Sequence, residues 1–377
     1  MKLLHLRTTV ESAYQKLRLM VVALPLWFLS IASAAQSLDL SLISPSDPNE
    51  VVVVLGDDLQ KCDADRHFEV VLVPAKPQAV APVPIFGNIV STRERLEFQP
   101  SYPLDYGSTY RAVVYCHVGS AMEPSWQREF SIPGRKLARE VPKVEISPSA
   151  TDLPANTLRF YLSFSTDMRG RFNRRDVSLR DDGGVERSGA FMSFGQELWS
   201  ADGRRLTLLL DPGRIKRGVS ANEVDGAPLV PGRRYTLSVL DAESDTSRAV
   251  LISAGFRAIE AERRPLIPAG WSVSVPAADT RKPVSLIFDR VMDRALLDHA
   301  FKIETSAGEV IAGKIQIAVG ERSVDFIPDH PWKAGEFAII FDGSLEDVCG
   351  NRIGEALDHE IWDPPSIEVP RITFPIK

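Results

Sequence analysis

The sequence has few of the residues on which catalytic and metal sites depend. Its 377 residues include three cysteines and six histidines. No C-x-x-C or H-x-x-x-H pair offers ligands at the spacing of a zinc site. The chain also lacks a G-x-S-x-G elbow, a G-x-G-x-x-G turn, a P-loop and an H-E-x-x-H helix. We therefore expect neither an enzyme nor a cofactor-binding protein.

The first residues have the layout of a signal peptide. Lys2, Arg7, Lys16 and Arg18 precede an apolar run over 19–32, and small residues follow. Positive charge holds the leading end in the cytoplasm while the apolar run enters the membrane. We predict a leader over 1–34 with cleavage before Ala35, and export to the periplasm, cell surface or medium. An uncleaved anchor is the alternative, but the run is short for a span and Pro25 interrupts it.

Net charge argues against one class of partner. The formal charge is -6, and removal of the cationic leader makes the chain more acidic still. Nucleic-acid affinity comes largely from cations that neutralise phosphates. We therefore expect no nucleic-acid partner and, after cleavage, no membrane span.

Most of the chain reads as short strands. Runs of strand length begin at Val51, Phe68, Tyr110, Leu158, Arg205, Tyr235, Val284, Ser323 and Phe337. Pro, Gly, Asp and Ser clusters separate these runs, as expected for turns. Helical spacing is confined to Met292–Phe301. The chain is predicted to be all-β.

One pattern of residues recurs three times. A strand ends at a proline, a glycine turn follows, and a large aromatic ring heads the next strand. The prolines are Pro100, Pro212 and Pro328; the glycines are Gly107, Gly232 and Gly335; the rings are Tyr110, Tyr235 and Phe337. The recurrence predicts three similar modules.

These units resemble the bacterial Ig-like domain of the S-layer type. The second unit has "LSFSTDM" at 162–168, and the third has "LIFDRVMDRALLDHAF" at 286–301 and "LEDVCGNRI" at 345–353. The first unit matches only in its closing half, and the second lacks the "D..GN" closure. The resemblance implies tandem antiparallel β-sandwiches, about three, at 37–133, 141–258 and 268–355. A Pro-rich tail over 356–377 would follow, adding an edge strand to a neighbour or remaining disordered.

Two further candidate sites are a disulfide and a calcium site. In an oxidising compartment Cys62 and Cys116 could close a loop within the first module, leaving Cys349 unpaired. Asp347 and Asn351 are weak calcium candidates, because their oxygens lie beside a turn glycine. The local alternative, which we favour, has Asp347 accepting backbone hydrogen bonds while Gly350 and Asn351 turn the chain.

A cationic surface is the third candidate site. Arginines and one lysine gather in two runs of the second unit: Arg169, Arg171, Arg174 and Arg175, then Arg214, Lys216 and Arg217. Converging loops would make a patch for acidic glycans or phosphate. The alternative is a solvated loop balanced by nearby aspartates such as Asp167.

The leading functional hypothesis is a non-catalytic exported scaffold or binding protein of the cell envelope, with an envelope protein or glycan as its partner. An accessory carbohydrate-binding protein is the second hypothesis, since exposed Trp199, Trp271 and Trp332 could stack on sugars. Buried tryptophans would favour the scaffold instead. A hydrolase with a perturbed carboxylate or His pair in a deep cleft at a module junction is the third alternative.

Overall fold

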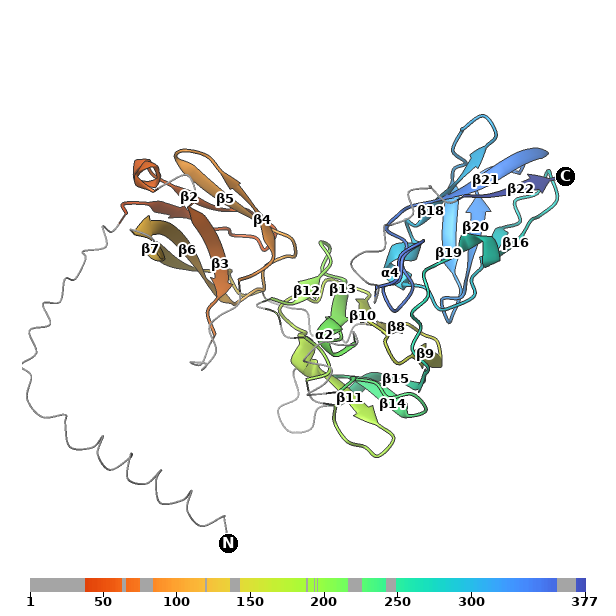
Figure 1. Ribbon diagram of the computed structural model, residues 1–377, viewed down its shortest axis with the longest axis horizontal. Helices are drawn as coiled ribbons and strands as arrows, with labels where there is room; N and C mark the ends of the chain where they lie inside the picture. Colours follow the sequence, from red (N-terminus) through yellow and green to blue (C-terminus); the bar gives the residue numbers. More distant parts are fainter. Residues whose placement is uncertain are drawn as a thin grey trace, which may run out of the picture. The chain divides into compact units, whose positions relative to one another are not determined.

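Three β-sandwiches make up the computed structural model (Figure 1). It describes residues 38–62, 66–74, 84–118, 121–135, 143–187, 189–192, 194, 196–215, 226–241, 249–357 and 371–377. The expected leader and residues Lys216 and Arg217 lie outside these ranges. Within the described ranges, no helix has both the length and the apolar character needed to cross a membrane.

The first sandwich packs a four-stranded sheet on a three-stranded one. The four strands, in sheet order, are β1 (Ser41–Ile43), β2 (Val52–Leu55), β5 (Arg95–Pro100) and β4 (Gly87–Ser91). The other sheet is β3 (His67–Leu72), β6 (Thr109–Val118) and β7 (Ala121–Ser131). A 3₁₀ helix, η1 (Asp57–Lys61), links β2 to the region before β3. Alternate residues such as Val52 and Val54 are fully buried between the sheets, as the two-residue period of a strand requires.

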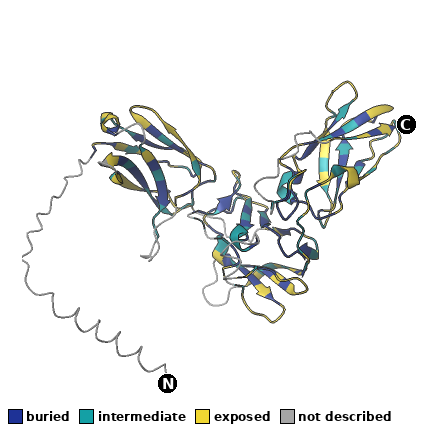
Figure 2. Ribbon diagram, viewed as in Figure 1, coloured by how far each residue is buried: buried dark blue, intermediate teal, exposed yellow. Residues whose placement is uncertain are grey.

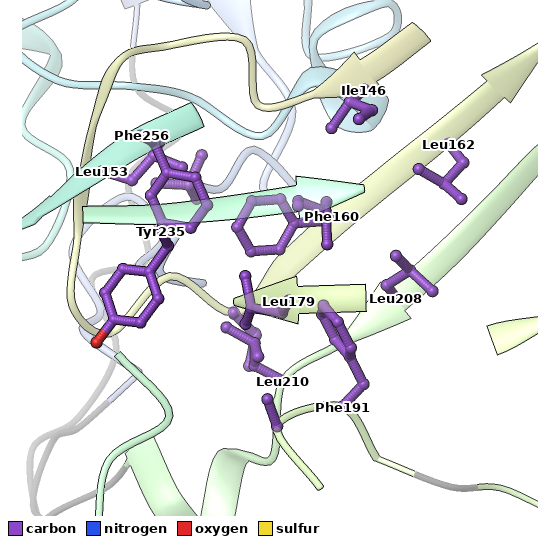
Figure 3. Packing of buried hydrophobic residues seen from close by; sticks show 14 of the residues in the cluster. Ile146, Leu153, Phe160, Leu162, Leu179, Phe191, Leu208, Leu210, Tyr235 and Phe256 are labelled. Atoms are coloured by element: carbon purple, nitrogen blue, oxygen red, sulfur yellow. The ribbon is translucent and has the colours of Figure 1, made fainter. Parts of the chain in front are cut away.

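The second sandwich adds one strand to this plan. One sheet is β12 (Leu198–Trp199), β13 (Arg205–Leu209), β10 (Arg159–Phe164) and β8 (Val144–Ser147). The other is β11 (Val177–Asp181), β14 (Arg234–Leu240), β15 (Val250–Ile259) and β9 (Asp152–Pro154), which pairs parallel to β15. Short helices are η2 (Arg174–Asp176) and α2 (Pro212–Ile215). Figure 3 shows Phe160, Leu208, Tyr235 and Phe256 among the side chains that form its core.

The third sandwich repeats the plan of the first. Its sheets are β16 (Ser272–Ser274), β17 (Val284–Ile287), β20 (Ser323–Pro328) and β19 (Gly313–Ile317), against β18 (Phe301–Thr305), β21 (Gly335–Phe341) and β22 (Arg371–Ile376). Short helices are η3 (Pro268–Gly270) and α4 (Arg294–Leu297), which lies inside the stretch predicted to be helical.

The last strand corrects one expected boundary. We expected the third module to end at 355, but β22 pairs with β21 along Gly335–Ile340. Its Phe374 and Ile376 are buried in the third core while Arg371 and Pro375 stay exposed. The tail therefore supplies a core strand of its own module, because its alternating apolar residues can be buried only against a sheet.

The strand order confirms the predicted fold class. With β9 counted as an extra strand beside β15, each sandwich has the order A-B-E-D in one sheet and C-F-G in the other, which is the Ig arrangement. Burial alternates along one strand of each sandwich in particular, namely β5, β13 and β20 (Figure 2). The chain is an all-β protein of tandem Ig-like sandwiches.

The repeated aromatic ring has the same place in each sandwich. Tyr110 stacks on Phe130, Tyr235 on Phe256 and Phe337 on Phe374, with ring centroids 5.7, 5.7 and 5.9 Å apart. In the first two sandwiches the tyrosine hydroxyl accepts a hydrogen bond from a backbone N–H five residues earlier, at 2.7 and 2.8 Å. This is the tyrosine corner of Ig folds. In the third, the ring of Trp332, also five residues earlier, packs edge-on against Phe337 at 5.4 Å.

Candidate functional site

The signature that suggested the Ig-like family builds the junctions between sandwiches. "LSFSTDM" and "LIFDRVM" each place a methionine four residues after a phenylalanine. The Phe164 and Phe288 N–H groups donate to the carbonyls of Arg204 and Arg322, and both methionines are buried. The two motifs thus occupy the same place in their sandwiches, at the ends of β10 and β17 and in the loops that lead to β11 and β18.

The turn opposite this loop differs between the two sandwiches. The N–H of Met168 donates to the Gly203 carbonyl and that of Met292 to the Glu321 carbonyl, each at 2.9 Å. Gly203 has a φ of 69° and Glu321 a φ of 49°. Residues other than glycine rarely adopt this left-handed backbone conformation, because it costs them of the order of 1–2 kcal/mol. A glutamate here needs a compensating interaction.

The compensation comes from the second sandwich. Glu321 is 1% exposed, and its carboxylate accepts hydrogen bonds from the N–H and the hydroxyl of Ser149, both at 2.8 Å. The Ser149 hydroxyl oxygen in turn accepts from the N–H of Gly320 at 2.8 Å. Bonds to a charged group are worth about 1.5–3 kcal/mol each, enough to offset the backbone cost.

A second contact across this junction centres on Arg159 of β10. Its guanidinium contacts Asp293 at 2.9 Å and Glu346 at 2.8 Å. Tyr161, two residues along, donates its hydroxyl hydrogen to the Asp293 carboxylate at 2.7 Å. Burial raises the pKa of Asp293, while Arg159 and Tyr161 oppose the rise. Asp293 of the third sandwich therefore depends on a cation of the second, and Glu346 is shared between Arg159 and Arg352 of its own sandwich.

A third contact holds the linker between the two sandwiches. The side chain of Asn156 donates to the Glu262 carbonyl at 2.6 Å and accepts from the Glu262 N–H at 2.9 Å. Arg290 donates to the Arg264 carbonyl at 2.8 Å and to Asp347 at 3.3 Å. Bonds from Arg264 lower the pKa of Glu262 to about 2, so Glu262 is charged at neutral pH.

Apolar residues close the same junction. Val291, Val348 and Cys349 of the third sandwich belong to the core cluster of the second. The N–H of Leu158 donates to the Val348 carbonyl at 2.7 Å. A cleft of about 190 Å³ remains beside them, and its lining residues include Glu260 and Arg322. We call this set of contacts the second–third joint.

The calcium candidates lie inside this joint. Both Asp347 oxygens accept hydrogen bonds: Oδ1 from the N–H groups of Cys349 and Asn351, and Oδ2 from the Asn351 amide and Arg290. Gly350 turns the chain with a φ of 80°. Asp347 thus makes the local hydrogen bonds that we favoured over calcium binding, and the Arg290 guanidinium lies where a cation would bind. Across the residues that the structure describes, no cluster of three or more His, Cys, Asp or Glu side chains is arranged to hold a metal ion.

The joint has little capacity for chemistry of its own. The thiol of Cys349 is fully buried and donates to Asn156 at 3.2 Å. Burial raises the pKa of this thiol well above its usual range, which disfavours the nucleophilic thiolate. The surrounding carboxylates are engaged by guanidinium groups and backbone N–H groups. The geometry fits a structural contact.

The predicted anion patch is only partly presented to solvent, because Arg175 is exposed but two other arginines are packed inside. Arg169 and Arg171 are 6% and 8% exposed. Arg169 forms an ion pair with Asp167 at 2.9 Å and lies over the ring of Tyr106 in the first sandwich. The loop is therefore balanced by Asp167, as the alternative held, but it is packed at a junction and not solvated.

The remaining described arginines of the patch brace their own sandwich. Arg174 donates to the Phe191 carbonyl at 3.3 Å, and Arg214 to the carbonyls of Gly189 and Gly226 at 3.0 and 2.8 Å. The Arg175 N–H donates to the Asn173 side chain, which caps η2. Arg174 and Arg214 thus both hold the segment that contains Gly189 and Phe191.

The three tryptophans are packing residues. Trp199, Trp271 and Trp332 are 1%, 7% and 2% exposed. The indole N–H of Trp271 donates to Asp289 at 3.1 Å, and that of Trp332 to the Lys282 carbonyl at 2.9 Å. Their faces are not available to stack on sugars.

The structure joins Cys62 and Cys116 in a disulfide, with Cα atoms 5.2 Å apart. The bridge ties the end of η1 to β6. Gly56, whose N–H donates to the Glu94 carbonyl, stands where Phe164 and Phe288 stand in the other sandwiches. The first sandwich thus has a disulfide-tied loop where the others have the F-x-x-x-M signature. Cys349 is the free cysteine among the described residues.

Sequence reasoning missed the residues that form the joint. Arg159, Glu321, Asp293 and Arg290 look like ordinary surface charges in the sequence. Alignment of the strands that follow the turn, "RRLTLLL" at 204–210 and "RSVDFIP" at 322–328, is the signal that could have found one of them, because it sets Glu321 against Gly203.

Comparisons with known proteins add little beyond the fold. No family model and no curated protein matches the chain. Among solved structures, the insect immune protein hemolin, whose structure is described as having implications for homophilic adhesion, aligns at 11% identity. The alignment covers 89% of this chain and 76% of hemolin with a TM-score of 0.19. At that score the likeness supports no inference about function.

Proposed function

We propose that the protein is a non-catalytic exported scaffold or binding protein of the cell envelope, built from Ig-like modules of the S-layer type. The second–third joint is the observation that carries the proposal. A joint held by buried ion pairs and shared apolar residues fixes one module against the next. Fixed spacing is what a scaffold needs and a flexible tether does not supply.

The state of the polar side chains supports the non-catalytic part of the proposal. The charged groups beside the cleft, Arg290, Glu262 and Asp347, are bonded to one another or to backbone groups. A catalytic carboxylate or base needs access to a substrate atom. The cationic leader and the disulfide of the first sandwich both support export.

Carbohydrate recognition receives less support. The hypothesis depended on exposed tryptophans and a convergent arginine surface. The tryptophans are buried, and the described arginines other than the exposed Arg175 are packed or donate local hydrogen bonds. We therefore keep the scaffold as the proposed function.

Two measurements on the full chain test it. Expression with its own leader, followed by fractionation and N-terminal sequencing, should find the mature protein beginning at Ala35 in the envelope or medium. In-cell cross-linking should then trap a defined envelope partner. An uncleaved cytoplasmic protein would refute export, and turnover of an envelope polymer by the purified protein would refute the non-catalytic assignment.

The rigid joint is tested separately. Labels on Thr236→Cys and Lys314→Cys, two exposed positions in the second and third sandwiches, should give one narrow distance distribution. Cys349 is buried and should stay unlabelled. A broad distribution in the otherwise native protein would remove the observation that carries the proposal.

A further inference from the structure

The edge strands of a sheet can pair with another chain, because their outer N–H and C=O groups have no partner within the sheet. Two such strands bound each of the six sheets that the structure describes. Short length, charged residues and proline all hinder pairing at an edge. Four edge strands are only two or three residues long: β1, β9, β12 and β16. Seven others carry a charged residue or a proline: β3, β7, β8, β11, β18, β19 and β22.

Strand β4 of the first sandwich is the one edge strand, among those described, with none of these protective features. It has five residues, Gly-Asn-Ile-Val-Ser, without charge or proline. It pairs with β5 on one side and with no other strand that the structure describes. Its Ile89 and Val90 are 43% and 54% exposed. The outer side of β4 is therefore open to pairing.

Strand β19 of the third sandwich has the same place in its sheet as β4. Each is the fourth strand in sheet order, and each begins at a glycine, Gly87 or Gly313, that pairs with the final proline of the neighbouring strand. A Cβ added to either glycine would lie 2.3 or 2.6 Å from the Cζ atom of a phenylalanine ring in that strand. The two strands thus approach their cores in the same way and can be compared residue by residue.

The compared positions differ in the features that control pairing. Strand β19 has Lys314 and Gln316 where β4 has Asn88 and Val90. A lysine protects an edge, because its charge repels a second copy of the same strand and stays in water. The first sandwich has a polar but uncharged residue at that position and an exposed valine two residues later. Its edge lacks the protection that the third sandwich has.

We propose that β4 is a dimer interface, at which a second copy of the chain adds its own β4 in antiparallel register. Pairing of identical strands about a two-fold axis requires each strand to be complementary to itself. With the axis at Ile89, Asn88 lies opposite Val90 of the second copy, and Gly87 lies opposite Ser91. No like charges meet, and the two Ile89 side chains lie opposite each other. Two four-stranded sheets become one continuous sheet.

The binding chemistry of this interface is that of strand addition. Main-chain hydrogen bonds supply affinity, and the side chains of Ile89 and Val90 supply apolar contact that water now covers. The inference goes beyond the proposed scaffold, because it makes a second copy of the chain the partner of this strand. It does not rest on export or on an envelope partner.

Sedimentation equilibrium of the full chain tests the dimer. The native chain should show a monomer–dimer equilibrium. The double variant Asn88→Lys, Val90→Gln gives β4 the residues of β19, and it should raise the dissociation constant at least about tenfold. Because β19 forms a strand with those residues, the variant should fold, which circular dichroism verifies. Gln127→Lys, at an exposed position of β7 in the same sandwich, is the control and should leave the constant unchanged.

A single spin label on each chain locates the interface. Ile43, in β1 at the far edge of the same sheet, is 53% exposed and can be replaced by a labelled cysteine. In the continuous sheet the two labels are seven strand spacings apart, each of about 4.8 Å, so their separation should be about 34 Å. This distance should appear in the native dimer and disappear in the double variant.

Three results would overturn the proposal: a monomer at every concentration, a dimer that the double variant leaves intact, or a label distance that does not fit the continuous sheet. A monomer whose envelope cross-link is lost in the double variant would assign β4 to a strand of another protein, and this too would overturn the dimer. Failure of the envelope experiments above would leave an observed dimer untouched, so the two proposals fail separately.

Discussion

Glu321 of the third sandwich occupies the position of Gly203 in the second. Both have positive φ, and the carbonyl of each accepts the N–H of the methionine in an F-x-x-x-M motif. The two differ in what lies beyond the turn, since the Glu321 carboxylate binds Ser149 of the preceding sandwich. A residue that is unfavourable for its own turn is thus favourable for the joint.

Replacing Glu321 by glycine should separate these two effects. The turn gains a residue suited to its φ, but Ser149 loses two charge-assisted hydrogen bonds. We expect a net loss of about 1–4 kcal/mol from the joint and little change in the third core. Hydrogen exchange should show faster exchange of the Ser149 amide. Unchanged protection of that amide would contradict the role of Glu321, and Glu309→Gly, at an exposed site, is the control.

Acid should weaken the second–third joint through Glu262. Bonds from Arg264 on the same linker, and then the charge of Arg290 in the third sandwich, hold its pKa at about 2 in the folded protein against 4.5 ordinarily. The part due to Arg290 stabilises the joint above pH 4.5. That stabilisation is lost as pH falls from 4.5 toward 2. The Thr236 and Lys314 label pair should therefore broaden below pH 4.5. In Glu262→Gln the pH-dependent part should be smaller; an equally steep change there would assign the acid sensitivity to other groups.

Tyrosine hydroxyls should stabilise the first two sandwiches and not the third. Tyr110→Phe and Tyr235→Phe each remove one hydrogen bond to a backbone N–H and keep the ring stack. We expect each to lower the free energy of unfolding by about 0.5–1.5 kcal/mol, measured by denaturant titration. Phe337→Tyr is the matched test in the third sandwich, because it adds a hydroxyl where the Trp332 ring packs against Phe337. A gain in stability there would show that the third corner can accept the same bond.

Reduction of the disulfide should destabilise the first sandwich alone. The bridge spans 54 residues, and both cysteines belong to the first core. Loss of such a bridge costs about 2–5 kcal/mol. Calorimetry with and without a reductant, repeated on Cys62→Ser with Cys116→Ser, should lower one transition and leave the others. A shift of every transition would mean that the three sandwiches unfold together.

Local pattern predicted more of the fold than of the site. The proline, glycine and aromatic repeat located the paired strands, because a strand buries every second residue and ends where a proline cannot donate. The same rule applied to Ile372, Phe374 and Ile376 would have placed β22. We did not assign this strand to the third sandwich, because a long segment that includes Asp347 and Cys349 separates β21 from β22.

The joints could not be predicted in the same way. Arg159 and Asp293 are 134 positions apart, and although Asp293 follows the methionine of a quoted motif, Arg159 belongs to none. In the sequence, each of these charged residues can be explained as an ordinary surface residue. Folding removes it from water, and only its partner across the joint can then compensate for the lost hydration. The arginines around 169 likewise looked like a ligand surface until Tyr106 and Asp167 were placed beside them.

By itself, the sequence determined the all-β class, the three-fold repeat and the aromatic corner of each sandwich. These depend on residue order and on periods of two within short segments. The tertiary structure alone decided which charges are buried, that the tryptophans face inward, and that the Ig-like signature serves as the contact between modules. Those outcomes depend on atoms far apart in the chain, which approach one another only when the sandwiches are packed.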